Sequence, residues 1–343
     1  MDTPNIDKVP RFLVMAACLI VIIAGLRAAT SIIVPVLISV LIAVISLPLQ
    51  NWLMVRKVPR SIAVFLTLIA DVLILVGFGF LIGGSLQGFA DEWPKYQARF
   101  RGMIEPLTAW LNAQGYNIAS EDITKEFNPR VALNIVNEAF RQVAFLVSNF
   151  ILVFLTILFV LSEAAGFSTK LERALGHSIR TMVRVDNIKK DIQQYLIVKT
   201  AISLTTGVLV GVSLALIGLD FPILWGLLAF LLNYIPSFGS IIAAIPPILL
   251  SLIQFGFSGR ALGVAVLFIF VNLLLGSLIE PLLMGRRLGL SVLVVFLSLL
   301  FWGWVWGPFG MILSVPLTMI IKIMLENSKD LRWIAVMLGT GKE

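Results

Sequence analysis

Residues 143–161, VAFLVSNFILVFLTILFVL, form an apolar block without a charged side chain. A hydrocarbon layer is about 30 Å thick, and a helix needs roughly 20 residues to cross it. Similar blocks recur along the chain, in which 59% of residues are hydrophobic and 13% are charged. With a mean hydropathy of +1.00, the chain has more apolar surface than a soluble core can bury. The blocks do not alternate like barrel strands, so the sequence predicts an all-α polytopic membrane protein.

The alternation of apolar and polar segments predicts about eight transmembrane helices and five parts of the chain. The parts are N-terminal transmembrane helices at 1–84, an extracytoplasmic helical insert at 85–141, a transmembrane helix with a basic cytoplasmic amphipathic helix at 142–199, a C-terminal transmembrane core at 200–326 and a cytoplasmic tail at 327–343. The insert has apolar residues at helical spacing. The insert has two possible roles. It serves either as a structural cap or oligomer contact, or as a gate for the substrate.

The short loops between spans indicate the orientation of the chain. The loop after the second predicted span, 31–49, contains Arg56, Lys57 and Arg60 without an acid. Such loops face the cytoplasm, which places both termini inside, at a bacterial inner membrane. The net charge of +7 follows from these loops, so we expect membrane lipids as partners and no nucleic acid. Cys18 is the one cysteine, which excludes an intramolecular disulfide.

Two apolar regions, 221–255 and 290–325, are too long for one span and are interrupted by proline and glycine. The first contains NYIPSFGSIIAAIPP at 233–247, and the second contains WGPFG at 306–310. Each is predicted to form a broken helical hairpin. Counting membrane crossings from a cytoplasmic N-terminus places the first tip toward the cytoplasm and the second toward the outside. This arrangement is typical of inverted-repeat transporters.

The interrupted segments are the candidate solute pathway. Backbone without helical pairing is tolerated at membrane depth only beside protein or a water-filled cavity, and the start of the second arm offers amide donors to a polar solute. We expect that a Cβ at Gly239 would close the approach to the backbone and would be strained by a positive φ. The candidates are Asn233, Tyr234, Pro236, Ser237, Phe238, Gly239 and Ser240 at the first tip, and Pro308, Phe309 and Gly310 at the second. The alternative is a tight turn at the membrane surface.

The motif NYIPSFGSIIAAIPP, together with QYLIVKTAISLTTG at 194–207 and EPLLMGRRLGLSVLVVFLSLLFWGWVWGPFGMILSVPL at 280–317, resembles the autoinducer-2 exporter family, also called the PerM family. The resemblance runs the length of the chain. It implies export of the small furanone-derived signal autoinducer-2 in quorum sensing, by a homo-oligomer with a pentamer as the expected state. The family also includes members assigned to cation/proton antiport, which leaves cations as an alternative substrate.

Charged residues inside spans are functional candidates, and Asp71 and Glu280 are the candidate coupling acids. Asp71 lies in the middle of the span 61–84; a neutral carboxyl packed against another helix is the alternative. We expect Glu280 to pair with Arg286 or Arg287, Lys199 to extend to the interface, and Asp220 to cap a helix.

The residues exclude several other classes of protein. The chain contains one histidine and has no paired carboxylates on one span, so we expect no enzyme, no catalytic or metal-binding set and no cofactor. The C-terminal GTGKE does not match a phosphate-binding loop. Transport would therefore be gradient-driven or facilitated rather than ATP-hydrolysing. A non-transporting scaffold or signalling protein is the rival from another class.

Overall fold

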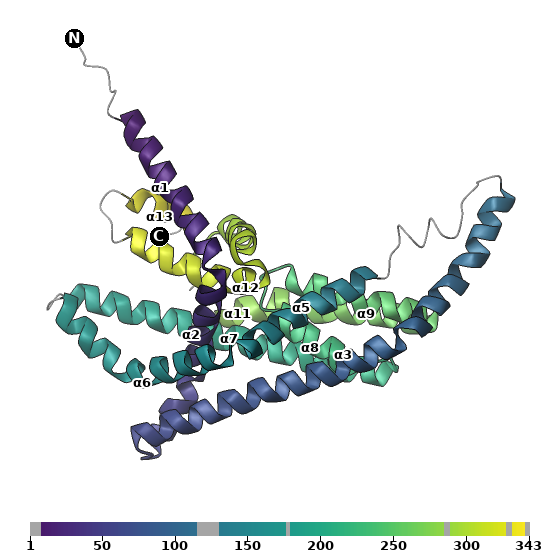
Figure 1. Cartoon of the computed structure of the whole chain (residues 1–343), viewed down its shortest axis with the longest axis horizontal. Helices are drawn as coiled ribbons and strands as arrows, with labels where there is room; N and C mark the ends of the chain where they lie inside the picture. The colour runs from purple at the N-terminus through teal and green to yellow at the C-terminus, as the bar shows by residue number, and fades with distance from the viewer. Residues whose placement is uncertain (1–7, 115–129, 176–178, 285–288, 327–330, 340–343) are drawn as a thin grey trace, which may run out of the picture.

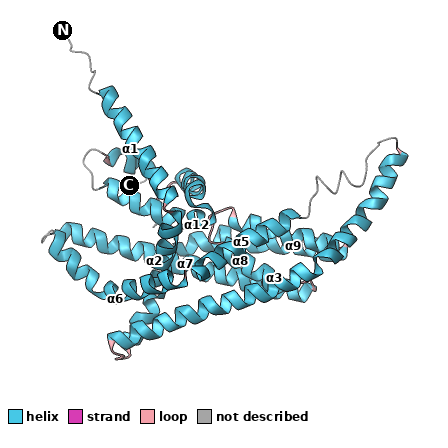
Figure 2. Cartoon of the chain, viewed as in Figure 1, coloured by secondary structure: helices cyan, strands magenta, loops and turns pink. Residues whose placement is uncertain are grey.

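The computed structural model describes residues 8–114, 130–175, 179–284, 289–326 and 331–339. This part of the chain consists of helices and loops (Figure 2). The helices are α1 (Lys8–Ala28), α2 (Thr30–Val55), α3 (Arg60–Ala113), α5 (Arg130–Ser148), α6 (Phe150–Leu175), α7 (Ile179–Ile217), α8 (Pro222–Leu232), α9 (Gly239–Phe255), α10 (Gly259–Val271), the π-helix η1 (Asn272–Ile279), α11 (Glu280–Met284), α12 (Val292–Glu326) and α13 (Arg332–Leu338).

The structure confirms the predicted class of an all-α polytopic membrane protein. Among the described residues, five helical segments are long and apolar enough to cross a membrane: Thr30–Val55, Arg60–Trp110, Lys190–Ile217, Gly259–Leu283 and Val292–Glu326. A sixth is present if α5 and α6 together count as one bent span. Shorter apolar helices, Ala17–Ala28, α8 and α9, complete the set.

The block 143–161 is not the single straight span that its composition predicts. Helices α5 and α6 meet there at an angle of 71°. Ser148 Oγ and Asn149 Nδ2 both donate to the carbonyl oxygen of Phe145, at 2.8 Å each. Side chains that hydrogen-bond to the preceding turn compete with the helical pattern and favour bends. These two polar residues therefore explain a break that mean hydropathy does not reveal.

The boundaries predicted at residues 84 and 199 lie inside continuous helices. Helix α3 crosses residue 84 and runs far beyond the main body of the molecule (Figure 1). Helix α7 joins the basic stretch directly to the predicted span 200–218. The described residues of the amphipathic helix expected before that span, within 171–199, belong to the end of α6 and the first part of α7. The placement of residues 85–141 outside the membrane and of the tail inside the cell stays a prediction.

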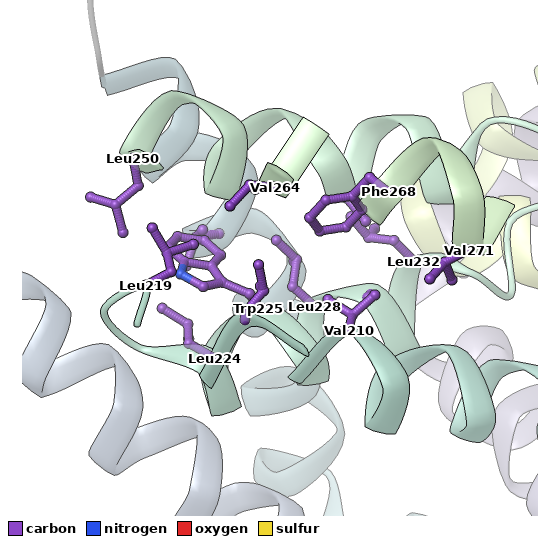
Figure 3. Packing of buried hydrophobic residues seen from close by; sticks show 14 of the residues in the cluster. Val210, Leu219, Leu224, Trp225, Leu228, Leu232, Leu250, Val264, Phe268 and Val271 are labelled. Carbon is purple, nitrogen blue, oxygen red and sulfur yellow. The ribbon is translucent and has the colours of Figure 1, made fainter. Parts of the chain in front are cut away.

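The main core lies around α8, which packs closely on α7. A Cβ on Gly207 would lie 2.7 Å from the carbonyl oxygen of Gly226, and a Cβ on Gly226 would lie 2.7 Å from that of Gly207. Small residues allow such backbone contact between membrane helices. Trp225 is fully buried, and Figure 3 shows its ring near Leu219, from the loop between α7 and α8, and Leu250 of α9. This packing holds the first hairpin in place.

Candidate functional site

The first predicted hairpin is present, with α8 and α9 as its arms. A Cβ on Gly239 would lie 1.7 Å from the carbonyl oxygen of Leu232, so the reversal brings backbone against backbone. The expected positive φ is at Ser237 (φ 61°) and not at Gly239. Gly239 is therefore required by the close approach of the chain rather than by its φ angle.

The second hairpin is also present, inside α12. The backbone leaves the helical region at Trp306 (φ −128°) and Gly307 (φ 64°). Trp302 Nε1 donates to Thr318 Oγ1 over 3.3 Å, although a straight helix would separate these positions by about 24 Å. The two arms of α12 consequently lie side by side.

The two reversals share one backbone contact. At the second tip a Cβ on Gly310 would lie 1.8 Å from the carbonyl oxygen of Trp302, which matches the contact of Gly239 with Leu232. The second reversal spans one residue more. Figure 1 shows α9 along the long axis of the molecule and part of α12 in a different direction. The inverted orientation of the hairpins across a membrane stays a prediction.

Polar side chains of the first tip bond to neighbouring helices. Asn233 Nδ2 donates to Ser203 Oγ on α7 at 3.0 Å, and this pair is buried. The hydroxyl of Tyr234 donates to Thr200 Oγ1, also on α7, at 2.9 Å. Ser240 Oγ donates to Asn272 Oδ1, at the start of η1, at 2.6 Å. We call these six residues and the ion pair described next the polar tip.

The ion pair joins Lys199 and Glu280, with 2.6 Å between Nζ and Oε1. The Lys199 side chain is 3% exposed and that of Glu280 is 19% exposed. Lys199 therefore does not extend to an interface, and Glu280 has a partner on α7. The pairing of Glu280 with the expected arginines stays a prediction. Arg286 and Arg287 lie outside the described residues. A buried ion pair needs close geometry to offset its desolvation, which this distance supplies.

The π-helix η1 connects two members of the polar tip. It begins at Asn272 and is followed directly by Glu280. Because π-helical segments are rare and occur frequently at functional sites, η1 supports a role for this region. A Cβ on Gly276 would lie 3.0 Å from Asn272 Oδ1. Bulk at Gly276 would thus press on the amide that accepts the Ser240 hydrogen bond.

The remaining candidates of the first tip differ in exposure. Gly239 is buried, Pro236 and Ser240 are half-buried, and Ser237 is exposed. Phe238 is 40% exposed and lies against Phe296 of α12, with ring centroids 5.7 Å apart. The tip thus combines buried polar groups with an exposed turn.

The candidates of the second tip lie in apolar surroundings. Phe309 and Gly310 are buried, and Pro308 is half-buried. Trp302 and Trp306 stack with ring centroids 4.9 Å apart, and Trp306 Nε1 donates to the carbonyl oxygen of Leu26 at 3.0 Å. Phe309 belongs to a cluster with residues of α2. This environment favours a packing role for the second tip.

Asp71 and Asp220 are not part of the polar tip. Asp71 is 5% exposed and accepts a hydrogen bond from Ser46 Oγ on α2 at 2.5 Å. Asp220 does not cap α8, whose N-cap is Phe221 without a side-chain cap bond. Instead, Asp220 Oδ2 accepts from the hydroxyl of Tyr96 on α3 at 2.6 Å. It therefore ties the predicted insert to the base of the first hairpin.

Comparison with known proteins identifies the family. The profile of the AI-2E family transporter matches residues 16–330. The chain belongs to the AI-2E transporter family. It is 37% identical to the AI-2 transport protein TqsA of Escherichia coli K12, over 96% of this chain and 95% of that protein.

Two further relatives carry less specific names. A putative transport protein of Haemophilus influenzae is 39% identical, over 96% of each chain. The putative transport protein YhhT of Escherichia coli K12 is 33% identical, over 100% of this chain and 98% of that protein. The AI-2E family is a transporter family and not an enzyme family.

Lys199, Thr200, Ser203 and Asn272 are candidate site residues that the sequence-based predictions missed. Lys199 and Ser203 are four residues apart in a helix and therefore share one face, and this spacing was visible in QYLIVKTAISLTTG. Their facing partners, Glu280 and Asn233, come from distant parts of the chain. No local signal in the sequence pairs them.

Proposed function

We propose that this AI-2E family member exports a small polar signal molecule, autoinducer-2, driven by a gradient or by facilitated diffusion. The polar tip carries the proposal, because it places buried hydroxyl, amide and charged groups beside a helix break. A membrane protein gains little from burying such groups unless they serve a pathway. The name of the Escherichia coli relative TqsA supports the choice of solute.

The hydrogen bonds at the polar tip suit exchange with a hydroxyl-rich solute. Tyr234 donates to Thr200, and Thr200 Oγ1 in turn donates to the carbonyl oxygen of Leu196 at 2.7 Å. A solute hydroxyl that replaces the tyrosine hydroxyl would leave the second bond intact. Each exchange replaces one hydrogen bond by another, so its net free energy is small.

The pathway candidates of the first tip are retained in this proposal. Asn233, Tyr234 and Ser240 supply donors, and the exposed Ser237 and Phe238 form the entrance. Phe309 packs the second hairpin against residues of α2, and a pathway role for Pro308, Phe309 and Gly310 stays a prediction. We further propose a homo-oligomer in the bacterial inner membrane, with both termini in the cytoplasm and a pentamer as the expected state.

A cation/proton antiporter is the second candidate function, favoured by the Lys199–Glu280 ion pair. In a charged pair beside a π-helix, the carboxylate is suited to exchange its lysine partner for a cation. The same pair can also bind the polar solute, so substrate assays must decide between the functions.

The test compares both substrates in one preparation of inverted membrane vesicles. Export from the cell corresponds to uptake into these vesicles. We expect saturable autoinducer-2 uptake that is absent from vesicles lacking the protein and lost in Lys199→Met. Proton movement that depends on sodium, without autoinducer-2 uptake, would overturn the export proposal in favour of antiport. Absence of both activities would support a scaffold.

A further inference from the structure

A second buried polar cluster lies between α2 and α3, apart from the polar tip. Ser46 and Gln50 are one turn apart on α2, and Thr67 and Asp71 are one turn apart on α3. The two helices are joined by a short loop, and Ser46 bonds to Asp71. In an antiparallel pair this register places Gln50 opposite Thr67, one turn nearer the loop. The register therefore places Gln50 and Thr67 one turn from the Ser46–Asp71 contact.

Two oxygens of this cluster are buried without a hydrogen-bond partner: Asp71 Oδ2 and Gln50 Oε1. Gln50 is 1% exposed and Asp71 is 5% exposed. An unpaired polar atom costs free energy when it is buried, and an unneutralised carboxylate costs more. The cluster thus lacks a positively charged group or a donor.

The donors of the cluster already point to other acceptors. Ser46 Oγ donates to Asp71 Oδ1, and Thr67 Oγ1 donates to the carbonyl oxygen of Ala63 at 2.8 Å. Gln50 Nε2 donates to the carbonyl oxygen of Leu161 on α6 at 3.2 Å. The acceptors that remain without a partner are Asp71 Oδ2 and Gln50 Oε1. Oxygen-only surroundings with one carboxylate suit a hard cation.

We propose that Asp71, Gln50, Ser46 and Thr67 form a binding site for a monovalent cation of the size of Na+. A single positive charge neutralises the single carboxylate, whereas a divalent ion would leave an excess charge in apolar surroundings. Those surroundings are the buried Leu47, Leu68 and Ile157, among others. For its role in transport the site rests on the cation/proton antiport candidate, which it deepens by naming a place where the cation binds. Na+ binding itself does not depend on autoinducer-2 export.

The site is tested by Na+ binding to the purified full-length protein in detergent. Melting temperature is measured against NaCl concentration, with choline chloride keeping the ionic strength constant. We expect a saturable rise of the melting temperature with Na+ or Li+ and none with choline. Asp71→Asn removes the carboxylate charge at constant size and is expected to abolish the rise. Binding is read without transport, so failure of export and failure of this site are distinguishable.

Further variants keep the test independent of the folding of Asp71→Asn. Gln50→Met retains the size of the side chain without its oxygen, and we expect about a tenfold higher Na+ concentration at half-saturation, equivalent to about 1.4 kcal/mol. Gln50→Glu adds a second carboxylate and is expected to shift the preference toward Ca2+. Ser39→Ala is the matched control, because its buried hydroxyl lies on the same helix and bonds to Pro35.

Three results would overturn the proposal. They are a melting temperature that does not respond to Na+, a response that survives in both Asp71→Asn and Gln50→Met, and a response to pH alone. The last result would mean that Asp71 carries a proton and that no metal cation binds.

Discussion

The reversals before Gly239 and before Gly310 each press a glycine onto an earlier carbonyl oxygen, at Leu232 in one hairpin and at Trp302 in the other. Around the first reversal lie hydroxyl, amide and charged side chains. Around the second lie stacked indole rings and aliphatic residues of α2. The same backbone contact thus occurs in two environments. A helix break in a membrane protein indicates a solute site only together with the side chains that face it.

The largest expected effect tests the contact of glycine with a carbonyl oxygen that both hairpins share. Gly239→Ala and Gly310→Ala each place a Cβ within 2 Å of a carbonyl oxygen, which the backbone cannot accommodate without moving. We expect both variants to lose folded protein in size-exclusion chromatography. Gly83→Ala is the control, because its Cβ would meet nothing within 4 Å. Normal folding of one tip variant alone would break the equivalence of the hairpins.

The next largest effect concerns the ion pair of the polar tip. Lys199→Met leaves Glu280 without its partner, and we expect a loss of about 3 kcal/mol in stability. Adding Glu280→Gln removes the unpaired charge and should restore most of the melting temperature. A double variant that is less stable than Lys199→Met would contradict this account of the pair.

A smaller effect is expected from the aromatic surroundings of the second tip. Trp306→Phe removes the hydrogen bond to Leu26 and weakens the stack with Trp302. We expect a loss of about 2 kcal/mol in stability, measured by thermal unfolding. Autoinducer-2 uptake per folded protein should stay within twofold of the original protein. A changed substrate preference would show that this tip also lies on the pathway.

The smallest effect is expected at the junction of the first tip with η1. Ser240→Ala removes the hydrogen bond to Asn272, and we expect a loss of about 1 kcal/mol. Ser314→Ala is the control in the second hairpin, since its hydroxyl bonds only within its own arm, to Met311. If both variants reduce uptake equally, the contact with η1 has no special role.

The sequence predicted the class and both hairpins because composition and helix-breaking residues act locally. It missed the bend at Asn149, which depends on side-chain bonds to Phe145 and not on hydropathy. It also missed the partner of Glu280, because Lys199 is distant along the chain and is brought close only by the packing of α7. Of the two reasons for which Gly239 was predicted to be essential, the positive φ is wrong, whereas a Cβ there does meet backbone, at the carbonyl oxygen of Leu232.

The most direct test of the central claim compares Tyr234→Phe with Trp306→Phe in inverted vesicles. Each removes a single hydrogen-bond donor, one from the polar tip and one from the aromatic tip. Autoinducer-2 uptake is measured over a range of concentrations and normalised to folded protein. The account predicts a several-fold higher KM for Tyr234→Phe and an unchanged KM for Trp306→Phe. An unchanged KM for Tyr234→Phe with a raised KM for Trp306→Phe would contradict it.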